Sequence, residues 1–255
     1  MSKIGAKIKK DRKKQIILTI IAARGGSRGI PNKNIRPIAG KPLLAYSILP
    51  ALSLVKKGLL DRLILTTDSS KIAAIGRRYG VETPFLRPHR LATSKSQMRD
   101  VLLHALHWLE KEESYRPDYF MLLQPTAPLR EEEDITACLK EIKKSYTDAV
   151  IVVSETELAS FFIKNGYLKK SFDTPNLKKN TNRQSMPKRY IPIGSTFLVR
   201  TKTFLKEKTV FPKKTRFVVC PNWRSVDINS PEDLAIAELL LKNKQKINKF
   251  IENFQ

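Results

Sequence analysis

The fold is decided by one stretch near the start of the chain, IILTIIAARGGSRG at residues 16–29. Its first seven residues form an apolar run broken only by Thr19, which is typical of a strand buried on both faces of a parallel sheet. A glycine-rich, basic loop follows at once. Because ligands bind at the carboxyl ends of the strands in an open α/β sheet, this loop is predicted to lie at a binding edge.

Strand and helix patterns alternate over most of the remaining chain. Further apolar runs predict strands at residues 62–67, 119–123, 149–153, 196–199 and 216–219. Helical spacing and capping residues predict helices that begin near residues 41, 69, 97, 131 and 230. The first of these would carry Pro42 in its opening turn. The alternation predicts one α/β domain over residues 16–245, a three-layer sandwich with a mainly parallel, Rossmann-like sheet.

Two segments do not fit this alternation. Residues 1–15 hold seven Lys or Arg and one acid, which predicts a basic, flexible tail. Residues 155–193 are polar and lysine-rich, with too little apolar content to fold alone. We interpret them as an insertion that serves as a lid or as an interface element.

The chain carries a large excess of positive charge. Its 255 residues contain 48 Lys or Arg against 24 Asp or Glu, a formal net charge of +24 at pH 7. Such an imbalance favours anionic partners, among them a nucleoside triphosphate, an acidic sugar and nucleic acid. Much of the excess is scattered over predicted helix ends and loops, which is typical of a solvated surface. Specific nucleic-acid binding is therefore not expected.

The cysteines and the apolar runs bear on the cellular compartment. Cys138 and Cys220 lie far apart and have no CxxC partner or histidine at metal spacing, so neither a disulfide framework nor a zinc site is predicted. The apolar run 16–22 is too short to span a membrane, and no small-residue cleavage site follows it. We therefore expect a cytoplasmic protein without membrane insertion.

The loop at residues 24–34 has the composition of a phosphate site. Its glycines are Gly25, Gly26 and Gly29, and its cations are Arg24, Arg28 and Lys33. Glycines let the backbone approach a phosphate and turn its N–H groups inward, while arginine grips phosphate oxygens with parallel N–H groups. The spacing matches neither GxxxxGK[ST] nor GxGxxG, so P-loop chemistry and dinucleotide binding are not supported. We interpret the loop as a phosphate cradle rather than a simple turn.

The run from Ile21 to Asn34 resembles the start of the CMP-N-acetylneuraminic acid synthetases, cytidylyltransferases that activate N-acetylneuraminic acid and related nonulosonic acids. Five later segments resemble the same family in the expected order: LTTD at 65–68, LRPHRLA at 86–92, LLQPTAPLR at 122–130, NRQ at 182–184 with Pro187, and SVDIN at 225–229. The resemblance covers residues 16–241. It implies a nucleotidyltransferase sheet with a small dimerisation insertion, and hence a homodimer.

The resemblance implies that the chain binds CTP and a nonulosonic acid. The anomeric hydroxyl of the sugar acid would displace pyrophosphate from the α-phosphate of CTP and give a CMP-sugar. The expected nucleotide-binding residues are Ala23, Arg24, Gly25, Gly26, Ser27, Arg28, Lys33, Asn34 and Arg87. Arg24 is expected to be catalytic, because phosphoryl transfer depends mostly on positioning and charge neutralisation.

The resemblance also assigns sugar and metal positions. The expected substrate-binding residues are Gln124, Arg183, Gln184 and Ser195. Asp227, the second expected catalytic residue, and Asn229 would hold Mg²⁺, since this cation takes oxygen ligands. The family usually has a second aspartate at the position of Asn229, so the amide is expected to weaken the metal site.

Two departures from the family pattern leave alternatives open. Ile191 and Ile193 stand where the sialic acid enzymes carry polar side chains, which favours a less polar sugar such as legionaminate. Activation of another sugar acid, such as ketodeoxyoctonate, is a second alternative. If Asn229 marks lost metal chemistry, the chain would instead be a non-catalytic nucleotide-binding homologue.

Overall fold

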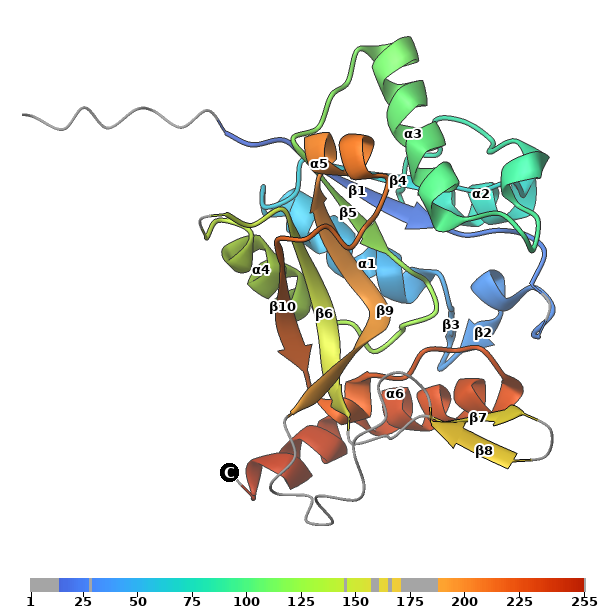
Figure 1. Cartoon of the computed structure of the whole chain (residues 1–255). Helices are drawn as coiled ribbons and strands as arrows, with labels where there is room; N and C mark the ends of the chain where they lie inside the picture. The colour runs from blue at the N-terminus through green and yellow to red at the C-terminus, as the bar shows by residue number, and fades with distance from the viewer. Residues whose placement is uncertain are drawn as a thin grey trace, which may run out of the picture.

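The computed structural model describes residues 14–27, 29–144, 146–156, 161–164, 167–170 and 188–254. Six strands form its central sheet in the order β10-β6-β9-β5-β1-β4 (Figure 1). Their bounds are β1 Ile17–Ala22, β4 Arg62–Thr66, β5 Tyr119–Leu123, β6 Ala149–Thr156, β9 Arg189–Arg200 and β10 Thr215–Cys220. Of these six, β9 alone runs antiparallel to its neighbours, so the sheet is mainly parallel as predicted.

Helices cover both faces of this sheet (Figure 1). Their bounds are α1 Ala45–Lys56, α2 Ser70–Arg78, α3 Met98–Glu113, α4 Glu132–Glu141 and α5 Thr201–Glu207. Helices α1, α2 and α4 share one buried apolar cluster with the sheet, and α3 and α5 share another on its opposite face. Two cores separated by one sheet confirm the three-layer α/β sandwich.

The last helix, α6 (Pro231–Glu252), lies beside the short antiparallel strands β2 (Pro37–Ile38) and β3 (Lys41–Pro42), in the lower part of Figure 1. A third apolar cluster joins these elements through Ile30, Ile38, Leu43, Ile228 and Ala237. Because this cluster draws on both the chain after β1 and the segment before α6, it holds the two segments together.

The predicted helix start at Lys41 is wrong by four residues. Lys41 and Pro42 form β3 and pair with β2 instead. The N–H of Leu44 donates to the carbonyl of Asn34 at 2.8 Å, which ties this segment back to the loop after β1. The helix therefore begins only at Ala45.

Much of the predicted insertion and tail lies outside the described residues. Within 155–193 the structure gives the end of β6, the start of β9 and, between them, an antiparallel hairpin of β7 (Phe161–Lys164) and β8 (Tyr167–Lys170). Residues 157–160, 165–166, 171–187 and the tail residues 1–13 are not described. No helix in the described part of the chain is both long enough and apolar enough to cross a membrane.

Candidate active site

A cavity of about 490 Å³ opens at the carboxyl ends of β1 and β5. Four segments far apart in the sequence meet there: the chain after β1, residues 87–101, the residues after β5 and the segment before α6. Predicted site residues that line it are Arg24, Ser27, Lys33, Asn34, Arg87, Gln124, Asp227 and Asn229. The fold thus brings the predicted nucleotide, sugar and metal positions together in one cavity.

The other predicted residues lie behind the cavity or outside the described chain. Ala23, Gly25 and Gly26 belong to the same loop but do not line the cavity, whereas Gly29 does. The predicted residues Arg28, Arg183 and Gln184 lie outside the described residues, so their roles stay predictions.

Hydrogen bonds fix the loop after β1 from two sides. Asn34, a buried residue, donates through Nδ2 to the carbonyl of Arg24 at 2.9 Å. Arg24 donates through Nη1 to the carbonyl of Thr93 at 2.8 Å. The N–H of Gly25 donates to Asp68 Oδ1 at 3.0 Å, so this backbone group is not free to bind an anion. The guanidinium of Arg24, with its five N–H groups, is therefore the main donor of this part of the loop.

Arg87 is a buried cation whose charge is only partly balanced by a nearby carboxylate. It is 5% exposed, and its Nη2 lies 3.6 Å from Asp68 Oδ1. Its Nε has no hydrogen-bond partner among the described residues. Burial lowers the pKa of Arg87, and the Asp68 carboxylate opposes that shift. A buried guanidinium with an unused donor on a cavity wall suits a phosphate or carbonyl oxygen of a ligand.

Lys33 joins the loop to the segment before α6. Its Nζ donates to the carbonyl of Ile228 at 2.6 Å. Burial lowers the pKa of Lys33, and the Asp227 carboxylate opposes that shift. The two segments also meet at Gly29, where an added Cβ would lie 2.8 Å from the carbonyl oxygen of Asn229. Any side chain at position 29 would therefore push the loop away from this segment.

The predicted metal residues form a small ligand set. Asp227 Oδ1 is buried and has no hydrogen-bond partner among the described residues, whereas Oδ2 accepts from Asn229 Nδ2 at 3.0 Å. The described part of the chain holds no group of three or more His, Cys, Asp or Glu placed to bind a metal. A cation at Asp227 would therefore complete its coordination with substrate and water oxygens, as Mg²⁺ commonly does.

The wall beside Gln124 depends on a close approach by β9. Gly194 has a φ of +68°, and an added Cβ would lie 2.5 Å from Gln124 Oε1 and 3.8 Å from Asp227 Oδ1. The sequence analysis did not identify Gly194 as a site residue. A lone glycine in a strand pattern indicates a bulge or a close approach, but it does not say what approaches.

Two predictions concern side chains of β9. Ser195 is 2% exposed and does not line the cavity, and its Oγ lies 3.4 Å from Thr196 Oγ1, so its contact with a sugar stays a prediction. Ile193 is buried in the core, and Ile191 does not line the cavity either. Neither isoleucine lines the cavity formed by the described residues, so the argument from them to a less polar sugar stays a prediction.

The cavity also contains small hydroxyl side chains that the sequence analysis did not single out. They are Thr93, Ser94, Ser96 and Thr126. Their signal in the sequence is the polar run TSKS at residues 93–96, directly after the predicted Arg-Pro segment. Such a run is also typical of an ordinary loop, which is why the pattern alone did not identify it.

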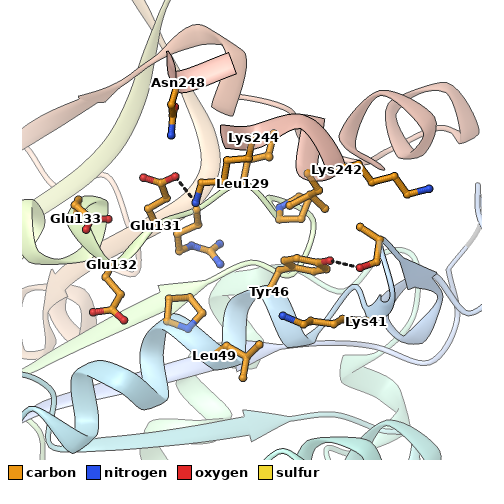
Figure 2. Close-up of a pocket in the computed structure, with 15 residues that line it drawn as sticks. Lys41, Tyr46, Leu49, Leu129, Glu131, Glu132, Glu133, Lys242, Lys244 and Asn248 are labelled. Carbon is orange, nitrogen blue, oxygen red and sulfur yellow. Dashed lines mark hydrogen bonds and ion pairs between the residues drawn. The ribbon is translucent and has the colours of Figure 1, made fainter. Parts of the chain in front are cut away.

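A larger cavity of about 770 Å³ lies between α1, the start of α4 and α6 (Figure 2). Its charged side chains largely pair with one another or with neighbours: Lys244 with Glu131 at 2.6 Å, Lys242 with Glu238 at 2.8 Å, and Glu132 with Lys57. Arg24, Lys33 and Asp227 do not line it. Chemistry rather than size therefore makes the smaller cavity the candidate active site.

Known proteins match the chain over nearly its whole length. The profile of the family described as cytidylyltransferase matches residues 18–250. The CMP-N,N'-diacetyllegionaminic acid synthase of Legionella pneumophila is 31% identical over 90% of this chain and 98% of that protein. The N-acylneuraminate cytidylyltransferase of Escherichia coli O18:K1:H7 is 34% identical over 91% of this chain and 54% of that protein.

A solved structure supports the same fold. The CMP:2-keto-3-deoxy-manno-octonic acid synthetase in complex with CTP superposes with a TM-score of 0.67 over 90% of this chain and 99% of that chain. Its sequence is 13% identical, so the likeness concerns the fold alone. The profile match over residues 18–250, together with relatives above 30% identity, shows that the chain belongs to the cytidylyltransferase family.

Proposed function

We propose that this chain activates a nonulosonic acid with CTP, giving a CMP-sugar and pyrophosphate. The observation that carries the proposal is the meeting of Arg24, Lys33, Arg87, Gln124 and Asp227 in one cavity of a cytidylyltransferase fold. The relatives named for legionaminic and neuraminic acids act on sugars of this class, which supports a nonulosonic acid as the acceptor.

The reaction needs charge neutralisation around the triphosphate. The anomeric oxygen of the sugar acid attacks the α-phosphorus, the bond from that phosphorus to the bridging oxygen breaks, and pyrophosphate leaves while the hydroxyl proton passes to water. Arg24 and Lys33 would hold the phosphate oxygens, because both cations line the cavity beside the glycine loop. Pre-oriented cations of this kind stabilise charge that develops in the transition state.

Part of the proposal is that Mg²⁺ binds at Asp227. The buried, unpartnered Oδ1 of Asp227 fits a cation, and carboxylate oxygen is a ligand that Mg²⁺ prefers. Asn229 would contribute its carbonyl oxygen if its carboxamide turned over, since its nitrogen now faces Asp227. When bound, the cation would supply positive charge to the triphosphate oxygens. Asp227 and Asn229 would hold it, and Lys33 would keep their segment against the loop.

The metal proposal is tested by Asn229→Asp. A second carboxylate would bind Mg²⁺ more tightly, so we expect the Mg²⁺ concentration that gives half-maximal turnover to fall or stay level. Asn243→Asp is the matched control, because Asn243 lies within α6, does not line the cavity and bonds to the Leu239 carbonyl. Complete loss of activity in Asn229→Asp alone would show that the amide has a role of its own and would contradict this assignment.

Dimerisation is a further part of the proposal. The insertion at residues 155–193 is polar, and a two-stranded hairpin such as β7–β8 is marginal in water by itself. Packing against a second copy would give the hairpin a partner. The same contact would bring the predicted sugar residues Arg183 and Gln184 close to an active site.

The proposed activity is tested with a matrix of substrates. Purified protein with Mg²⁺ is incubated with each of the four ribonucleoside triphosphates and a panel that contains neuraminate, legionaminate, pseudaminate and ketodeoxyoctonate. Pyrophosphate release is expected with CTP and a nine-carbon acid. Release only with the eight-carbon acid would move the assignment to that substrate, and no release from any pair by folded protein would overturn the enzyme assignment.

A further inference from the structure

Arg130 is a buried arginine that the proposed reaction does not use. It is 6% exposed and lies between the end of β5 and the middle of β9. Among the described residues no carboxylate lies within ion-pair distance of it. Burial lowers the pKa of Arg130 to about 9, and the Asp134 carboxylate opposes that shift, so the guanidinium stays charged at neutral pH. A buried charge without an ion-pair partner is costly, so its hydrogen-bond partners have to account for its presence.

All of those partners are neutral oxygens, and one of them belongs to Gln124, which lines the candidate active site. Nε and Nη2 both donate to the carbonyl of Ser195, the Nε bond at 2.9 Å. Nη2 also donates to the carbonyl of Gln124 at 2.7 Å, and Nη1 donates to Ser47 Oγ at 2.7 Å. Ser47 Oγ in turn donates to the Gln124 carbonyl at 3.3 Å. One side chain thus ties together β5, β9 and α1.

The strand pairing explains why these carbonyls need a donor. The pairing of β5 with β9 ends at Leu123 and Thr196, one residue before Gln124 and Ser195 would meet. The pairing of β6 with β9 jumps from Ile151–Phe197 to Val153–Pro192, so residues 193–196 of β9 form a wide bulge. Bulges leave backbone groups without ladder partners and commonly lie beside active sites. Arg130 supplies the donors that the ladder does not.

We infer that Arg130 is a positioning residue for the sugar-acid half of the active site, because it fixes the Gln124 end of β5 against the β9 bulge. The bulge places Gly194 against Gln124 Oε1 and near Asp227 Oδ1. Arg130 does not line that cavity, so it acts through Gln124 and Gly194 rather than on the substrates. Within the described part of the chain, Arg130 makes its hydrogen bonds to Ser195, Ser47 and Gln124 and none to Arg24, Lys33 or Arg87, which are proposed to hold CTP.

This inference rests on the proposed function and is tested by Arg130→Lys. Lysine keeps the charge but loses the planar fork, so it cannot hold both carbonyls at once. We expect kcat/KM for the sugar acid to fall about 10²-fold, the scale of a misplaced active-site group. The KM for CTP should stay within about twofold. Arg62→Lys is the matched control, because Arg62 bonds Glu82 and Glu113 at the amino end of β4, and both constants should stay unchanged there.

If Arg130→Lys does not fold, Ser47→Ala provides a second test of the inference. It removes one hydroxyl that bridges Arg130 and Gln124, and we expect a loss of about 3- to 10-fold in kcat/KM for the sugar acid, the value of one hydrogen bond. Unchanged sugar-acid kinetics in the folded variants would overturn the inference. A rise in the KM for CTP as large as the effect on the sugar acid would also overturn the inference, because it would show a general structural role.

Amide hydrogen exchange can test the positioning role of Arg130 even if the proposed enzymatic activity is wrong. If the unaltered chain turned over no sugar acid, the proposed function would fall while the positioning role could still be measured. Arg130→Lys should then speed amide exchange at Gln124, Thr126 and residues 193–196 while leaving β4 and α2 unchanged. Exchange that is unaltered, or faster throughout the chain, would contradict the positioning role.

Discussion

Arg24 and Lys33 both donate to backbone carbonyl oxygens, those of Thr93 and Ile228. A carbonyl orients a cation without cancelling its charge, whereas a carboxylate would neutralise it. Carboxylates balance part of this charge, since Asp227 acts on Lys33 and Asp68 lies 3.6 Å from Arg87, whose Nε has no partner among the described residues. The cavity therefore keeps a positive potential that suits a triphosphate.

Arg24→Ala tests this reading of the charge. Loss of one pre-oriented cation should lower kcat by about 10²-fold or more. Arg36→Ala is the matched control, since Arg36 is exposed and does not line the cavity. Steady-state pyrophosphate release measures both variants, and near-normal turnover of Arg24→Ala would remove this residue from the mechanism.

Two glycines, Gly194 and Gly40, allow a controlled test of the close approach beside Gln124. Gly194 and Gly40 both have positive φ, +68° and +82°, but only an added Cβ at Gly194 meets another atom within 4 Å. Alanine at either position should cost about 1–2 kcal/mol of stability through the left-handed backbone. Only Gly194→Ala should also displace Gln124 and reduce turnover. Equal activity of the two variants, at equal stability by urea unfolding, would show that the close approach has no catalytic role.

At the scale of elements, the first turn of α6 fixes the segment that carries Asp227 and Asn229. Ser230 caps the helix, with its Oγ accepting from the N–H of Asp233 at 3.2 Å. Asp233 Oδ2 accepts in return from the N–H groups of Ser230 and Asn229, at 2.8 Å and 2.9 Å. This capping box holds the backbone of Asn229 at the cavity.

Ser230→Ala should destabilise the chain by about 1 kcal/mol in urea unfolding, because the first turn of α6 loses its cap. Ser230→Gly should cost only a few tenths of a kcal/mol, since glycine is tolerated at this position. Equal costs for the two variants would mean that the cap does not stabilise the helix.

The elements show what the sequence could and could not predict. The strand at 119–123 was predicted to the residue, because a short apolar run between polar segments has clear ends. The start of α1 was misplaced because pairing of Lys41 and Pro42 with β2 overrides local helix signals. Gly194 is the local sign of the bulge of β9, but its extent arises from register differences on the two sides of the strand, which the sequence does not show. The Arg130 contacts could not be predicted for the same reason.

At the scale of the whole molecule, the predicted three-layer fold and the family are confirmed. Most predicted site residues meet because they follow strand ends, and such ends share one edge of a parallel sheet. The topology of the sheet therefore explains why these site residues lie close together. The second large cavity was not predicted, because it is lined by helix surfaces whose charges look like ordinary solvated faces (Figure 2).

The proposed dimer gives a prediction at this scale. The chain has a mass of 29.1 kDa, and sedimentation equilibrium should return twice that value at concentrations where the protein is active. Replacing residues 157–187 by a short glycine-serine linker should give the monomer mass. A monomer mass for the unaltered, active protein would contradict the proposal.

The central claim is that the smaller cavity joins CMP to a nonulosonic acid, and its most direct test is the mass of the product. Protein, Mg²⁺, CTP and the acid that releases pyrophosphate are analysed by mass spectrometry, with Arg24→Ala in parallel. We expect a species with the mass of CMP plus the acid minus one water, formed by the unaltered chain and reduced about 10²-fold in the variant. Release of pyrophosphate with only free CMP as the other product, or equal amounts of CMP-sugar from both proteins, would contradict it.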